Sequence, residues 1–100
     1  MKFENINIRK VMAMALATDA IIVDVRPTER FRKGHIPMAI SLPYGQIEMG
    51  YVTLPKNRTI IVYCDTGGAS TKAAYKLSES GYRVINCIGG MRNYNGSLTR

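Results

Sequence analysis

Short, nearly continuous apolar runs alternate along the chain with segments whose apolar residues recur at helical spacing. The strand-type runs cover residues 21–25, 39–42, 59–63 and 82–86. The helical segments cover residues 8–16, 28–31, 46–49 and 70–80. Continuous apolar runs are typical of strands buried on both faces of a parallel sheet. Because such runs alternate with helices over short connections, the pattern predicts an α/β fold with helices on both sheet faces.

Capping residues mark where several of these segments begin and end. Asn7 precedes the first helical segment, and Thr28 follows Pro27 at the second, so both are candidate N-caps. Gly34 and Gly81 stand where the second and last helices should stop, since glycine readily adopts the conformation that ends a helix. The boundaries and the apolar pattern therefore predict the same elements.

The composition fits one folded domain. A length of 100 residues allows a single domain, and we expect it to span residues 1–100. With 46% hydrophobic residues the chain can fill a core, which argues against disorder. No apolar run approaches the roughly 20 residues that cross a bilayer, and the first residues do not resemble a signal peptide. We therefore expect a cytoplasmic protein with no membrane association, and two cysteines argue against a disulfide scaffold.

The chain is basic, with a formal net charge of +7. Its lysines and arginines are spread along the sequence, no nucleic-acid-binding motif is present, and aromatic residues do not interleave with the basic ones. The charge therefore favours attraction of small anions or of an acidic partner over nucleic-acid binding.

The candidate chemistry centres on Cys64, which ends the strand-type run before a glycine-bearing loop and a helix start. This order puts the sulfur at the carboxyl edge of the sheet, where parallel α/β sheets bind their ligands. Loop N–H groups and the positive end of a helix there favour an anion. Cys64 is thus a candidate thiolate nucleophile. The alternative is a cysteine that simply ends a core strand.

Four stretches of the chain, in order, resemble the signatures of the rhodanese-like domain family in its single-domain form. They are residues 24–39, with Asp24, Arg26 and Gly34-His35-Ile36-Pro37; residues 62–70, with Cys64, Gly67 and Ser70; residues 73–82; and residues 89–94, with Tyr94 where an aromatic residue is usual. The similarity covers about residues 6–95. It implies one rhodanese-like domain with a central parallel five-stranded sheet flanked by helices on both faces.

The resemblance also implies a sulfurtransferase. Cys64 would take the outer sulfur of a donor, thiosulfate or a persulfide, carry it as a cysteine persulfide, and pass it to a thiol acceptor on a small molecule or a protein. Asp24 and Arg26 would support the loop, and neither a cofactor nor a metal is needed. We expect a monomer or a weak homo-oligomer. The expected substrate-binding loop consists of Asp65, Thr66, Gly67, Gly68, Ala69 and Ser70.

Two loop residues depart from the family pattern. Asp65 stands where a basic residue is frequent, and Ala69 where Arg, Ser or Thr is frequent. An acid beside the sulfur opposes a thiolate and repels an anionic donor such as thiosulfate. We therefore expect weak thiosulfate activity, and a non-catalytic binding or sensing module remains the alternative.

The remaining chemistry-bearing residues have structural interpretations. His35, the one histidine, lies in the Gly-His-Ile-Pro turn and is expected to be hydrogen-bonded rather than catalytic. Cys87 is expected in the core rather than as a resolving thiol. A phosphatase loop would need an arginine where this chain has Ser70, which argues against phosphate transfer.

Overall fold

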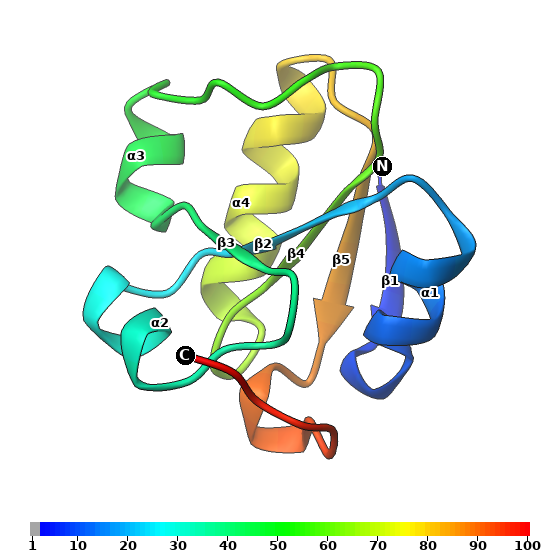
Figure 1. Cartoon of the computed structure of the whole chain (residues 1–100). Coiled ribbons are helices and arrows are strands. Elements are labelled where there is room, and N and C mark those ends of the chain that lie inside the picture. Colours follow the sequence, from blue (N-terminus) through cyan, green and yellow to red (C-terminus); the bar gives the residue numbers. More distant parts are fainter. Residues whose placement is uncertain (1–2) are drawn as a thin grey trace.

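All four predicted strand-type runs contribute strands to one parallel sheet in the computed structural model, which describes residues 3–100. The strands are β1 (Phe3–Asn7), β2 (Ile21–Asp24), β3 (Ile40–Ser41), β4 (Ile60–Tyr63) and β5 (Val84–Ile88). Their order across the sheet is β1-β5-β4-β2-β3, and every neighbouring pair is parallel. The predicted α/β architecture is confirmed, and Figure 1 shows the strands with the helices around them.

Strand β1 has no counterpart in the hydrophobic pattern. It pairs with β5 in the register Phe3↔Val84 to Asn7↔Ile88, at the outer edge of the sheet. Only Phe3 and Ile6 of this strand are partly buried, and its other residues are exposed. An edge strand with so few apolar positions does not show the continuous apolar run of a buried strand. Strand β1 is therefore recognised only by its pairing with β5.

Apart from the last one, at residues 91–93, the helices of the described residues follow the predicted segments with shifted ends. They are η1 (Ile8–Lys10, a 3-10 helix), α1 (Val11–Ala17), α2 (Thr28–Lys33), α3 (Tyr44–Glu48), α4 (Gly68–Glu79) and η2 (Met91–Asn93, a 3-10 helix). Asn7 caps η1 as expected, its Oδ1 accepting the N–H of Arg9 at 2.9 Å. No helix within residues 3–100 has the length and apolar character needed to cross a membrane.

The prediction of Thr28 as a helix cap is wrong. Thr28 is the first residue of α2, and Pro27 holds the cap position without a side-chain cap hydrogen bond. The carbonyl oxygen of Pro27 accepts the N–H groups of Arg30 and Phe31 at 2.9 and 3.3 Å. Proline favours the extended conformation that the residue before a helix adopts. The Pro27 carbonyl group therefore accepts the first hydrogen bonds of α2, and no capping side chain is needed.

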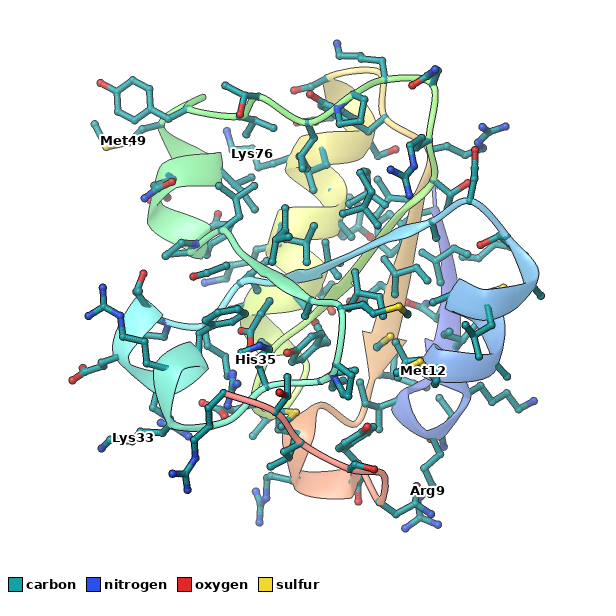
Figure 2. All side chains as sticks on the ribbon, viewed as in Figure 1. Arg9, Met12, Lys33, His35, Met49 and Lys76 are labelled. Carbon is teal, nitrogen blue, oxygen red and sulfur yellow. The ribbon has the colours of Figure 1, made fainter. Side chains whose placement is uncertain are left out.

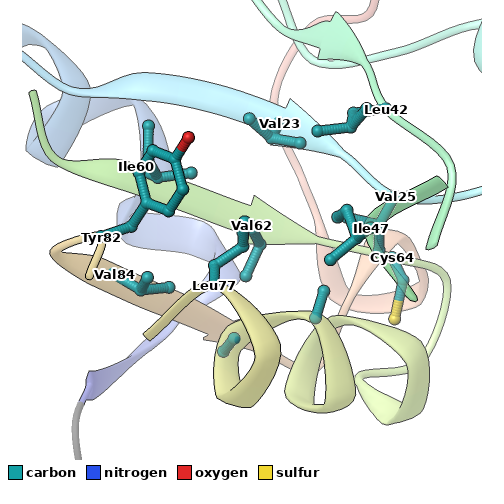
Figure 3. Packing of buried hydrophobic residues seen from close by; sticks show 12 residues of the cluster. Val23, Val25, Leu42, Ile47, Ile60, Val62, Cys64, Leu77, Tyr82 and Val84 are labelled. Atoms are coloured by element: carbon teal, nitrogen blue, oxygen red, sulfur yellow. The ribbon is translucent and has the colours of Figure 1, made fainter. Parts of the chain in front are cut away.

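Alternate residues of the strands build two separate cores, one on each face of the sheet. The first core contains Val23, Val62 and Val84 with residues of α3 and α4, as Figure 3 shows. The second contains Ile22 and Ile61 with residues of η1 and α1. This alternation is the two-residue period of a strand, and it puts helices on both faces.

Candidate active site

Cys64 lies directly after β4, at the carboxyl edge of the sheet, with its side chain on the face covered by α4. Its Sγ accepts two backbone hydrogen bonds, from the N–H of Gly67 at 3.0 Å and from that of Ser70 at 3.3 Å. The residue is 4% exposed. Hydrogen bonds to a buried sulfur stabilise its anion more than its neutral form, so this geometry suits a thiolate.

The loop between Cys64 and α4 depends on the conformation of Gly67. Its φ of 108° lies in the region that favours glycine, and it is the N-cap of α4. Its carbonyl oxygen accepts the hydroxyl of Thr71 at 2.7 Å and that of Ser70 at 3.3 Å. Gly68, by contrast, is the first helical residue and has no positive φ. Of these two loop glycines, Gly67 is therefore the one whose backbone conformation favours glycine.

A second segment, far from Cys64 in the sequence, holds the loop from the other side. The N–H of Met91 donates to the carbonyl oxygen of Cys64 at 2.9 Å, and that of Arg92 donates to the carbonyl oxygen of Asp65 at 3.1 Å. A Cβ added at Gly90 would overlap the Asp65 carbonyl group, so only glycine permits this approach. The sequence did not predict these contacts between residues 90–92 and the loop.

Asp24 and Arg26, which are expected to support the loop, form a buried ion pair. Arg26 Nη2 lies 2.7 Å from Asp24 Oδ2 and donates to the carbonyl oxygen of Gly34 at 2.7 Å. Tyr63 donates its hydroxyl to the same carboxylate at 2.7 Å. Burial opposes the charge on Arg26, but the hydrogen bond and charge of Asp24 outweigh it and raise the Arg26 pKa. Burial and the bond to Asp24 likewise raise the pKa of Tyr63.

Asp65 is held by two arginines that precede it by more than 30 residues in the chain. Its Oδ1 accepts a hydrogen bond from Arg30 Nη2 at 2.9 Å and lies 3.6 Å from Arg26 Nη1. The side chain of Asp65 is 34% exposed. These ion pairs, which the sequence did not predict, partly compensate the negative charge that we expected beside the sulfur.

A cavity of about 430 Å³ opens beside Cys64. Its walls come from the end of β2, the start of α3 and the loop before α4. Residues Val25, Arg26, Pro43, Tyr44, Asp65 and Ala69 are among those that line it. Of the other predicted loop residues, Thr66 also lines the cavity and is exposed, whereas Ser70 is fully buried. The sequence thus located the sulfur and its loop, but not the cavity walls contributed by α3.

The contacts of His35 and Cys87 fit a structural role for both residues. His35, labelled in Figure 2, stacks on Phe31 with ring centroids 3.7 Å apart, and its Nδ1 lies 2.8 Å from the Phe31 carbonyl oxygen. Cys87 is fully buried in the second core, on the sheet face opposite to that of Cys64. Burial raises the pKa of its thiol to about 12. Neither side chain is therefore arranged to react at the cavity.

Comparison with known proteins identifies a single family over most of the chain. The model of the Rhodanese-like domain family matches residues 8–97. A sulfurtransferase of Allochromatium vinosum is 35% identical over 79 residues, covering 78% of this chain and 74% of the relative. Thiosulfate sulfurtransferase PspE of Escherichia coli is 34% identical over 73 residues, covering 71% of this chain and 70% of the relative.

Solved structures are similar as well. A crystal structure of a rhodanese-like domain protein from Staphylococcus aureus matches with a TM-score of 0.83 at 28% identity, covering 97% of each chain. In a relative from Bacillus subtilis, by contrast, the aligned region is only 41% of the protein. The same fold thus occurs alone and as part of larger proteins.

Proposed function

Because the chain belongs to the rhodanese-like domain family, we propose that it transfers sulfane sulfur through a persulfide on Cys64. Its relatives named as sulfurtransferases support sulfur transfer as the general activity. The observation that carries the proposal is the pair of backbone N–H groups at 3.0 and 3.3 Å from Sγ. A persulfide carrier needs a sulfur anion before and after each transfer, and these donors stabilise one without a metal.

The proposed reaction has two displacement steps on sulfur. In the first, the Cys64 thiolate attacks the outer sulfur of thiosulfate or of a persulfide. The donor S–S bond breaks, its electron pair leaves with sulfite or with a thiolate, and the outer sulfur stays bonded to Sγ. In the second, an acceptor thiolate attacks that terminal sulfur, and the electron pair of the Sγ–S bond returns to Cys64. Sulfane sulfur changes partners in both steps, so no external oxidant or reductant is required.

The other residues of the site position the sulfur. The N-terminus of α4, a helix of 12 residues, begins beside the loop and adds the positive end of its dipole. Asp24 and Arg26 act as positioning residues, since the Arg26 guanidinium connects the buried carboxylate of Asp24 to Asp65. The net charge of +7 would draw in an anionic donor or an acidic acceptor protein.

Intact mass measurement of the full chain tests the proposal. After incubation with thiosulfate or with inorganic polysulfide, we expect a gain of one sulfur atom that a reducing thiol reverses. Cys64→Ser should abolish the gain, and Cys87→Ser, which also removes one thiol, should retain it. No gain in the folded wild-type protein with either donor would instead support the non-catalytic module. A gain that survives in Cys64→Ser would reject Cys64 as the carrier.

A further inference from the structure

We propose that the cavity beside Cys64 binds the apolar organic group of a small-molecule persulfide or thiol. This inference rests on the proposed function and specifies its substrate class. The substrate would be an organic persulfide, RSSH, or the corresponding thiol, RSH, with an aliphatic or aromatic R group. Thiosulfate, a small dianion without an organic group, would be a poor fit.

The size and walls of the cavity support an organic group. A volume of about 430 Å³ is in the range of small-molecule sites and exceeds what a single sulfur atom requires. Val25, Pro43 and Tyr44 supply apolar wall, and Ala69 adds a methyl group next to the loop. Figure 3 shows Val25 close to the Cys64 side chain. An R group in the cavity would therefore lie beside the reacting sulfur.

The charges around the cavity argue against a dianion. Arg26 and Asp65 are the charged residues among those that line it, and they lie 3.6 Å from each other. Arg26 also pairs with Asp24 at 2.7 Å, and Asp65 pairs with Arg30 at 2.9 Å. Each charge in the lining is thus already matched by an opposite charge. A dianion entering this space would lose water without gaining an unpaired cation.

The wall formed by Tyr44 is fixed by the backbone. The Tyr44 N–H donates to the carbonyl oxygen of Val25 at 3.0 Å, which attaches the start of α3 to the end of β2. Pro43, the N-cap of α3, restricts the chain just before it. The apolar wall is therefore already in place before a ligand enters, which reduces the entropy lost on binding.

The exchange of sulfur between RSSH and Cys64 balances in atoms and electrons without any further reactant. The Cys64 thiolate attacks the outer sulfur of RSSH, the S–S bond of RSSH breaks, and RS⁻ leaves with its electron pair. The proton of RSSH stays on the transferred sulfur, which gives Cys64-S-SH. The reverse reaction transfers the same sulfur to RS⁻, so one cavity serves donor and acceptor. Both directions keep the R group in the same position.

A series of alkanethiols tests the inference on protein loaded with inorganic polysulfide. Ethanethiol, 1-propanethiol and 1-butanethiol have thiols of matched basicity and differ only in apolar length. Their second-order rate constants for removing sulfur from Cys64 are measured by quenching and intact mass. We expect each methylene group to raise the rate constant about two- to four-fold, the effect of burying its surface. 2-Mercaptoethanol, similar in size to 1-propanethiol but polar, should react more slowly per thiolate.

Variants of the cavity wall show whether the cavity causes the increase of the rate constant with alkyl chain length. The readout is the ratio of the 1-butanethiol and ethanethiol rate constants within each protein, since changes in the reactivity of Cys64 cancel in that ratio. Tyr44→Phe should retain the wild-type ratio, and Tyr44→Ser should lower it. Ala69→Leu, which fills the space from the other side, should lower it as well and provides a second measurement if Tyr44→Ser does not fold.

The outcomes separate this inference from the proposed function. A loaded wild-type protein with a ratio near one would overturn the apolar site but leave persulfide transfer standing. A high ratio unchanged in the folded Tyr44→Ser and Ala69→Leu variants would also overturn it. Folded wild-type protein that gains no sulfur from either polysulfide or thiosulfate would overturn both proposals.

Discussion

Arg30 Nη2 donates to Asp65 Oδ1 across 2.9 Å and so connects α2 to the loop that carries Cys64. Asp65 alone would put an uncompensated negative charge beside the sulfur. Arg30 and Arg26 both form ion pairs with this carboxylate. The two guanidinium groups are therefore less available to bind an anionic donor. The pairing therefore affects which donors the site accepts, and the first two predictions concern it.

Asp65→Arg should increase the rate of sulfur loading from thiosulfate. The substitution removes the negative charge and leaves the guanidinium groups of Arg30 and Arg26 without this partner. Charge changes at such distances are worth on the order of a few kcal/mol before screening, and salt reduces them. Loading rates should be measured by intact mass at several salt concentrations. A rate that does not change, or a gain that is independent of salt, would show that Asp65 does not influence the donor.

Arg30→Gln should have the opposite effect and slow loading from thiosulfate, because Asp65 keeps its charge and loses its closest cation. The pair is partly exposed, at 51% for Arg30 and 34% for Asp65, so we expect a change of only a few-fold. Arg32→Gln is the matched control, since Arg32 is also an exposed arginine of α2. Equal slowing in both variants would indicate an effect of net charge rather than of the ion pair.

Gly67→Ala should reduce persulfide formation and stability together. A side chain at a φ of 108° is strained, by roughly 1–3 kcal/mol, and relief of the strain would move the N–H group that lies 3.0 Å from Sγ. Gly68→Ala is the control, because Gly68 is helical and a Cβ there meets nothing within 4 Å. It should leave stability unchanged or raise it by up to about 1 kcal/mol. Thermal unfolding and sulfur loading should be measured on both variants, and equal behaviour would contradict this role for Gly67.

Met38→Gly should stabilise the protein. Met38 has a φ of 74°, the one positive value on a non-glycine residue within the described part of the chain, and it is 58% exposed. Relief of roughly 1–2 kcal/mol of strain should exceed the extra chain entropy of glycine, leaving a gain of about 0.5–1 kcal/mol. Denaturant unfolding of both proteins measures this difference in the free energy of unfolding. Met49→Gly is the control, because Met49 is 68% exposed at a φ of −85° and its replacement should destabilise.

Stability should fall as pH rises above about 9, in part because of Cys87. Its thiol has a pKa raised to about 12 in the folded protein from an ordinary value of 9.0. The unfolded chain therefore loses this proton first, and stability present below pH 9 is lost progressively toward pH 12, by at most about 1.4 kcal/mol per pH unit. Tyr63, whose pKa is also raised, contributes at higher pH.

Urea unfolding between pH 8 and 10 tests the Cys87 contribution. Cys87→Ala lowers stability at every pH by leaving a small cavity, so the comparison uses the slope with pH rather than the absolute value. The slope should be shallower in Cys87→Ala than in the wild-type protein. Equal slopes would mean that the Cys87 thiol ionises as readily in the folded protein as in the unfolded chain.

Sequence determined the parts of this protein that depend on local pattern. The runs at residues 21–25 and 59–63 are apolar at successive positions because both of their faces are covered, and this property can be read without a structure. The position of Cys64 between such a run and a helix start follows from the order of residues alone. Local chain chemistry likewise identified Asn7 as a cap.

Tertiary structure decided the contacts between residues far apart in the chain. Strand β1 exists because β5 supplies its hydrogen-bonding partner, and nothing in its own five residues requires a strand. Arg30 meets Asp65 across 35 positions of sequence, and Met91 donates to the Cys64 carbonyl group from a turn far beyond the loop. Sequence pattern reports how each segment partitions between core and water. Which polar groups then face one another, and which cavity remains between the segments, depends on how the sheet and its connections bring distant segments together.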